Sequence, residues 1–131
     1  MLSAIIIPAE AVHGRSYFNK LGARRYLVIS IAMVAARIAI RDRCIDQAAV
    51  SIGSCSVVAS RLHAVESALI GQSIDTQPAA LVTREHLHEL APIDDIRATA
   101  HYRHHAALQL VRRTITAAIN SSVSGSGGAG V

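Results

Sequence analysis

LVISIAMVAARIAI (residues 27–40), RDRC (41–44) and IDQAAVSIG (45–53) form the part of the chain that decides the fold. The first run is rich in Val and Ile, which strands favour. In the last run Ala48, Val50 and Ile52 alternate with other residues, the pattern of a strand with one buried face. RDRC has the length of a tight turn, although it lacks the Gly that such turns prefer. We therefore predict an antiparallel hairpin.

The first strand of this hairpin is apolar on both faces in its first half. Its two faces carry Val28, Ala32, Val34, Ile38 and Ile40 on one side and Ile29, Ile31 and Met33 on the other. A two-layer domain leaves one face in water, so two interpretations stay open. Either the segment is covered twice within the chain, as a central strand or as a helix, or another domain covers its second face.

The remaining elements are a short strand and three helices. SAIIIPA (3–9) has the composition of a brief edge strand that ends at Pro8. Helical spacing of apolar residues marks residues 59–71, with Ser60 as N-cap and Gly71 at the C-terminal end, then 76–92, then 98–119. We predict an α+β fold with an antiparallel sheet of three to four strands and about three helices on one face. The domain spans residues 1–120, and SSVSGSGGAGV (121–131) is a flexible Gly/Ser tail.

Composition narrows the class of protein. A chain of 131 residues is enough for one domain, and the absence of Trp with only one Phe and three Tyr predicts an aliphatic core. Cys44 and Cys55 make neither a disulfide framework nor a zinc site, which fits the cytoplasm. The most apolar window, residues 27–36, is too short to cross a membrane, so we expect no membrane span.

DDIRATAHYRHHAALQLVRR (94–113) is the stretch richest in chemically active side chains. His101, His104 and His105 lie at helical spacing, but nothing matches a zinc motif, and a polar helix surface is the simpler interpretation. The arginines of this stretch and the net charge of +4 could serve phosphate contacts. A nucleic-acid surface would carry more basic excess and exposed aromatic residues. We assign no metal ligand and no catalytic residue.

Three segments, YFNKLGARRYLVISIAMVAA, SIGSCSVVASRLHAVESALIGQ and PIDDIRATAHYRHHAALQLVRR, resemble a known family in order and spacing. That family is the C-terminal domain of the FAD-binding medium subunit of molybdenum hydroxylases, including xanthine dehydrogenase and carbon monoxide dehydrogenase. The resemblance runs from about Ile5 to about Ala118. Its most specific elements are Phe18-x-Lys20-x-x-x-Arg24-Arg25, Glu66-x-x-Leu69-x-Gly71 and Asp95-x-Arg97-x-x-x-x-Tyr102-Arg103.

The resemblance implies a domain that packs beside an FAD domain and supports the flavin. The lysine that approaches the flavin in this family matches Lys20, where a cation could stabilise negative charge on the reduced cofactor. Asp95, Arg97, Tyr102 and Arg103 match the helix entry, where charge-assisted bonds would fix the long helix to the sheet. Glycine-rich pyrophosphate loops are missing from these 131 residues, so an N-terminal FAD domain would make most FAD contacts. Val57 and Val58 stand where many relatives have a proline.

The expected function is therefore that of a part of a larger oxidoreductase. It would support FAD while electrons pass from iron-sulfur clusters to an acceptor, with molybdopterin and the 2Fe-2S clusters held by partner subunits. Nucleic acid is not expected as a partner. Two alternatives remain: an arginine-rich α+β binding module for nucleic acid or an acidic protein, and an inactive truncated remnant.

Overall fold

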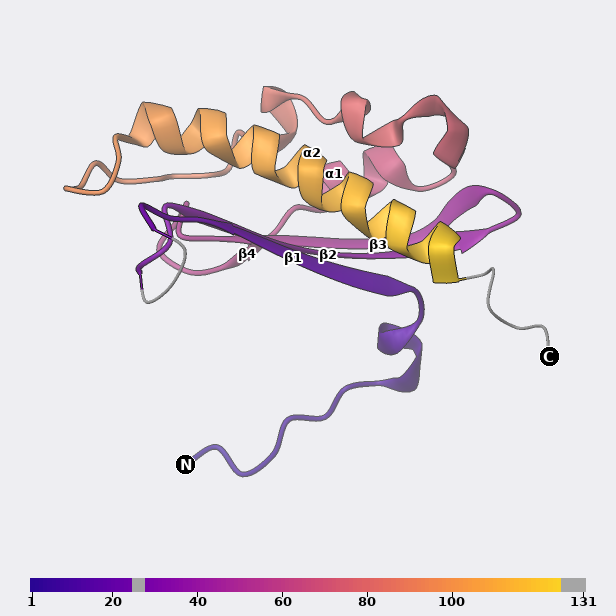
Figure 1. The fold of residues 1–131 in the computed structure, drawn as a ribbon. Coiled ribbons are helices and arrows are strands. Elements are labelled where there is room, and N and C mark those ends of the chain that lie inside the picture. The colour runs from indigo at the N-terminus through magenta and orange to yellow at the C-terminus, as the bar shows by residue number, and fades with distance from the viewer. Residues whose placement is uncertain (25–27, 126–131) are drawn as a thin grey trace.

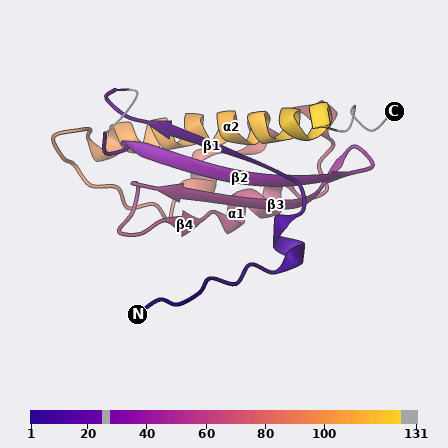
Figure 2. The same cartoon turned by 60° about the horizontal axis from the view of Figure 1, so that its bottom comes forward.

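The computed structural model describes residues 1–24 and 28–125. The strands are β1 (Arg15–Leu21), β2 (Ala32–Arg41), β3 (Cys44–Gly53) and β4 (Ser60–Arg61). The α-helices are α1 (His63–Leu69) and α2 (Ala100–Gly125), and the short 3-10 turns are η1 (Ala9–Val12), η2 (Ile74–Thr76), η3 (Pro78–Leu81) and η4 (Arg84–Leu87). The strands form one antiparallel sheet in the order β1-β2-β3-β4 (Figure 2).

The predicted hairpin is confirmed as the pair β2–β3. Its turn closes without glycine because Asp42 and Arg43 both adopt left-handed backbone, with φ of 50° and 61°. Two successive residues of positive φ match the right-handed twist of a hairpin. Arg43 is held in this unfavourable conformation by Asp75, to which its Nε donates at 3.2 Å.

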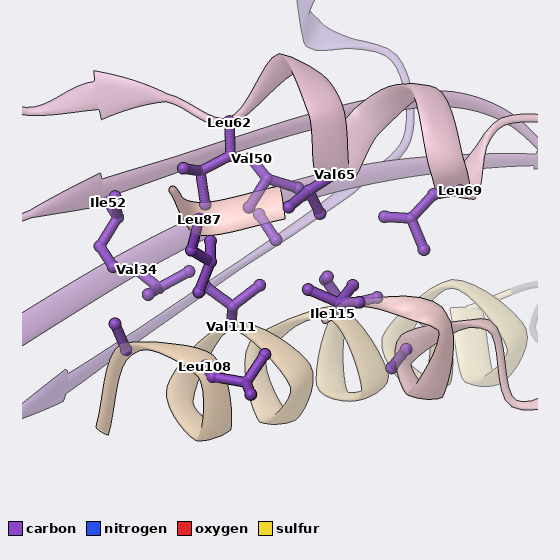
Figure 3. Close-up of a cluster of buried hydrophobic side chains, with 14 of the residues drawn as sticks. Val34, Val50, Ile52, Leu62, Val65, Leu69, Leu87, Leu108, Val111 and Ile115 are labelled. Atoms are coloured by element: carbon purple, nitrogen blue, oxygen red, sulfur yellow. The ribbon is translucent and has the colours of Figure 1, made fainter. Parts of the chain in front are cut away.

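The helices cover one face of the sheet (Figure 1). Along β2 the even-numbered residues point into this layer, and Val34 and Ile38 are fully buried. Figure 3 shows Val34 in the same cluster as Val111 and Ile115 of α2 and Val65 of α1. The core contains Val, Ile, Leu and Ala, so both the aliphatic core and the α+β class are confirmed.

The opposite face of the sheet, called the open face below, is covered by neither of the described α-helices; only Arg37, away from Lys20, bonds to the N-terminal segment, where its Nη1 donates to the His13 carbonyl oxygen at 2.6 Å. It carries the side chains of Ser16, Phe18, Lys20, Met33, Ala35, Arg37, Ala49 and Ser51, and Gly53. Ala35 is exposed, and Phe18 is 57% exposed. The described part of the chain therefore covers β2 on one side only, which excludes the interpretation that places two layers within it. Cover by another domain stays a prediction.

The strand expected at residues 3–9 is wrong. Residues 1–8 form no regular element and are exposed, and η1 follows at Ala9–Val12. A strand needs a neighbour for its backbone groups, and none of the described strands lies beside this segment, which leaves the sheet on the side opposite to the helices (Figure 1). The strand actually present, β1, escaped the pattern because RSYFNKL mixes polar and aromatic residues without clean alternation.

The helix expected over residues 76–92 is also wrong. Short turns, η3 and η4, replace it because Gln77 has left-handed backbone (φ 52°) and Val82 is extended. The apolar positions nevertheless face inward, and Leu87 and Leu90 are buried. For α1, Ser60 lies in β4 and is not the N-cap, whereas Gly71 ends the helix region with φ 82° as predicted.

The long C-terminal helix is confirmed with shifted ends. It begins at Ala100 after Thr99, whose Oγ1 accepts a hydrogen bond from the Tyr102 N–H at 3.1 Å. It continues to Gly125, so the predicted boundary after residue 120 falls inside α2, and residues 126–131 lie outside the described part. Neither α-helix in the described part is long and apolar enough to cross a membrane.

The sidedness of β2 predicts opposite outcomes for neighbouring substitutions. Val34→Asp should prevent folding, because it buries an unpaired carboxylate at the centre of the core. Ala35→Asp, one residue further on the open face, should leave the domain folded within about 1 kcal/mol. Circular dichroism with urea unfolding measures both. Equal effects of the two substitutions would contradict the one-sided burial.

Candidate functional site

Lys20, the predicted cofactor-contacting residue, lies at one end of the open face. It is the register partner of Met33, and Met33 is in turn the partner of Gly53. The three residues form a row across β1, β2 and β3, called the Lys20 row below. Lys20 is exposed, and its amino group makes no hydrogen bond or ion pair with any other residue in 1–24 or 28–125.

The surface beside Lys20 is apolar. A Cβ placed on Gly53 would lie 2.5 Å from Met33 Cε, so the Met33 side chain lies across the glycine and uses the space that the missing side chain leaves. Phe18 and Ala35 are the neighbouring exposed residues. An apolar surface with one unpaired cation suits a ligand that combines an apolar face with an electron-rich polar edge.

Arg103 ties the start of α2 to the same end of the sheet. Its side chain is buried, with 3% exposure, and its Nη1 donates to the carbonyl oxygens of Ile31 (2.7 Å) and Ser54 (3.1 Å). Its Nη2 donates to Asp95 Oδ1 at 2.8 Å. The Nε atom is buried and has no hydrogen-bond partner among the described residues. Burying a guanidinium is costly unless it is paired, so these bonds fix the positions of the three partners.

Asp95 completes this connection, as predicted from the helix entry. Its Oδ1 accepts from the Arg97 N–H at 2.8 Å, and Arg97 Nη1 donates to Oδ2 at 2.8 Å. The Arg97 N–H, together with the two guanidinium groups and against the effect of burial, holds the pKa of Asp95 well below its ordinary value. The predicted role of the Tyr102 phenol is wrong: its side chain is half exposed and bonds to none of the described residues, and Tyr102 contributes its backbone N–H, which donates to Thr99 Oγ1.

Glu66 has a role that the sequence reasoning missed. This buried carboxylate accepts from the Val50 N–H at 2.8 Å and from Arg61 Nε and Nη2 at 2.7 and 2.9 Å. Burial raises its pKa, but the bonds from Arg61 and Val50 outweigh that effect and leave the pKa below its ordinary value. It thereby satisfies a β3 N–H that no strand reaches. The available signals were a glutamate between apolar helix positions and its place in the Glu66-x-x-Leu69-x-Gly71 element of the resemblance, neither of which indicates a bond to β3.

The histidines do not converge on a metal-binding arrangement in the described residues. No group of three or more His, Cys, Asp or Glu side chains there could hold a metal ion. His101 and His105 are exposed, and His105 Nδ1 lies 3.4 Å from Arg84 Nη2. His86 Nδ1 accepts from the Thr83 N–H at 3.0 Å in the cap of η4.

Fold comparison with solved structures places similar domains in larger chains. The structure of quinoline 2-oxidoreductase from Pseudomonas putida 86 matches with a TM-score of 0.78 and 23% identity over 90% of this chain and 40% of that one. Carbon monoxide dehydrogenase from Hydrogenophaga pseudoflava, in a form lacking the Mo-pyranopterin moiety, matches with a TM-score of 0.71 and 24% identity. The match covers 86% of this chain and 39% of that one. Reconstituted CO dehydrogenase from Oligotropha carboxidovorans matches with a TM-score of 0.69 and 20% identity, over 81% of this chain and 37% of that one. The chain thus spans about two fifths of those chains.

A four-stranded antiparallel sheet with helices on one face and Lys20 on the other defines an α+β domain. The family model for the CO dehydrogenase flavoprotein C-terminal domain matches residues 17–118. The chain belongs to this family. A search of curated protein sequences gives no match.

The lowered pKa values of Glu66 and Asp95 predict acid sensitivity. A carboxyl group with a lower pKa in the folded state stabilises the fold fully above its unfolded-state pKa of about 4. This stabilisation is lost as the pH falls through the folded-state values, because the unfolded chain then binds more protons. Urea unfolding between pH 7 and pH 3 should show a falling free energy of unfolding.

Glu66→Gln provides the specific test, with exposed Glu89→Gln as the control. Glu66→Gln should lower stability at pH 7 and flatten the loss on acidification, whereas Glu89→Gln should follow the original protein. Parallel pH profiles for all three proteins would contradict the assignment of the acid sensitivity to Glu66.

Proposed function

We propose that this chain is the C-terminal domain of the FAD-binding subunit of a molybdenum-containing hydroxylase, and that its open face lies toward the flavin. The observation that carries the proposal is Lys20: an unpaired amino group on an uncovered apolar sheet face, within the residues that match the flavoprotein family. Phe18 is exposed beside Lys20, and an exposed aromatic side chain on such a face is stabilised when another molecule or domain covers it.

The residues of the open face fit a flavin. Met33 and Phe18 offer an apolar surface to a planar ring system, and the Lys20 ammonium is able to donate to an electron-rich edge of that ring. When bound, FAD supplies the two-electron chemistry that links an upstream electron donor to an acceptor. This chain's contribution is to orient the ring, to exclude water from one side and to favour negative charge near Lys20.

The rest of the proposed assembly lies outside this chain. Most contacts to FAD belong to a further flavin-bearing domain, since the related chains are more than twice as long. Molybdopterin and 2Fe-2S clusters belong to partner subunits of a hetero-oligomer, and we place the assembly in the cytoplasm. The chain has no proposed catalytic residue of its own.

The arginine-rich binding module is the weaker alternative because several arginines are already engaged. Arg61 binds Glu66, Arg103 binds Asp95, and Arg112 Nε donates to the carbonyl oxygen of Val82 at 2.9 Å. Side chains committed to internal carboxylates and carbonyls do not offer their donors to phosphates. Neither this module nor an inactive remnant explains the unpaired Lys20 on the open face.

A chimera tests the proposal directly. This chain would replace the matching 40% of the quinoline 2-oxidoreductase flavoprotein chain, and flavin absorbance would be measured after purification. The chimera should retain FAD. Lys20→Ala should weaken retention about tenfold and make the flavin potential more negative, because a charge-assisted bond is lost.

Lys20→Arg should restore much of both properties, since it keeps the positive charge. Arg15→Ala is the matched control, an exposed cation at the other end of β1. Unchanged retention and potential in Lys20→Ala would remove the assignment of Lys20, and a chimera free of flavin would remove the proposed function.

A further inference from the structure

A hollow of about 330 Å³ adjoins the Lys20 row at the end of the sheet. Its walls come from three loops: the one before β2, the one after β3 and the one before α2. It is lined by Ile29, Ser30, Ser54, Ser56, Val57, Ala91, Ile93, Asp95 and Arg103. This hollow, called the loop hollow below, is separate from the open face, although Ser54 directly follows Gly53 of the Lys20 row.

The rim of the loop hollow is aliphatic and exposed. Ile29, Val57 and Ile93 are 62%, 99% and 70% exposed. Single exposed aliphatic residues are ordinary, but here one residue from each of three loops converges on one cavity. Such convergence is typical of a site where an apolar group of a partner is buried.

The loop hollow is also held in a fixed shape. Arg103 bonds to Ile31, Ser54 and Asp95, which belong to the three wall loops. The hydroxyl of Ser56 accepts from the Ala91 N–H at 3.2 Å and donates to the Cys55 carbonyl at 2.7 Å, which joins two of the loops again. A socket whose walls are ordered beforehand loses little entropy when it is filled.

These bonds also define the chemistry of the occupant. Asp95 and Arg103 neutralise each other in the wall, and the Ser56 hydroxyl is already engaged. The unpaired Nε of Arg103 is itself buried and is not presented at the surface of the hollow. A charged group would therefore find no free charged partner in the wall. The aliphatic rim therefore favours an uncharged apolar side chain.

We propose that the loop hollow is the anchor socket for an apolar side chain of the flavin-bearing domain. This inference rests on the proposed function. It commits to that domain for two reasons: the loop hollow continues directly from the Lys20 row, and about three fifths of the related quinoline 2-oxidoreductase chain has no counterpart here. Docking of one side chain in the loop hollow then fixes the distance between the Lys20 amino group and the flavin ring.

Hydrogen exchange on the chimera tests the socket without relying on activity. Amides of residues 54–58 and 91–97 should exchange about tenfold more slowly in the chimera than in the isolated chain. Val57→Asp and Ile93→Asp should abolish this difference, because each places a carboxylate on the rim. Val57 is 99% exposed, so its substitution leaves the isolated domain folded.

Leu81→Asp is the control, since Leu81 is an exposed aliphatic residue of η3 that does not line the loop hollow. It should keep the protection. Rapid exchange of both loops in a chimera that retains FAD overturns the socket and leaves the proposed function standing. Protected loops in a chimera that lacks FAD support the socket and remove the flavin assignment.

A second copy of this chain is the rival occupant. Sedimentation of the isolated chain should therefore show a monomer at concentrations where the chimera's loops are protected. Dimerisation that Val57→Asp abolishes would assign the loop hollow to self-association and overturn the proposal.

Discussion

The central strand β2 is buried on one face and open on the other, and the rest of the structure is arranged around this asymmetry. Its even-numbered residues meet α2, while α1 packs on the neighbouring strand β3, so the packing of the last helix against the second strand fixes the layers of the domain. The odd-numbered residues Met33 and Ala35 have no such cover. An antiparallel sheet with one free face is stable only when that face is polar enough for water or is met by something else. Here it carries two cations, Lys20 and Arg37, among small and apolar groups, and Arg37 is bonded to the His13 carbonyl oxygen and to Gln47.

Sequence reasoning was most accurate where burial imposes a period. The β2–β3 hairpin, α1 and α2 each place apolar residues at the spacing of their own geometry, so their type and inward faces were predictable. It failed where one backbone angle decides whether a segment forms a helix or a series of turns. Gln77 in left-handed conformation breaks residues 76–92 into turns that still bury Leu87, and the apolar spacing alone does not distinguish these turns from a helix. Residues 3–9 have the composition of a strand but lack a neighbour, which is a property of the surroundings.

The candidate site was predictable in part, for a similar reason. Lys20 and the Asp95–Arg103 bond came from the family resemblance, and the ion pair is present in the structure. The Met33–Gly53 contact and the loop hollow depend on which residues from separate segments meet, and no local pattern records that. Arg103 illustrates the difference: its sequence position indicates a helix entry, whereas its bonds to two distant carbonyls connect the helix with both strands of the hairpin at their open end.

The order of elements along the chain bears on how the protein is made. Asn19 of β1 donates to Thr114 of α2 at 3.3 Å, so groups 95 positions apart are neighbours in the finished domain. A ribosome releases the N-terminal strands first, at roughly 5–20 residues per second. The aliphatic side of the nascent sheet gains its principal cover only after α2, which begins nearly 60 residues after β2 ends, has emerged. During that interval the aliphatic side of the nascent sheet is exposed, and transiently exposed apolar surface of this kind promotes aggregation.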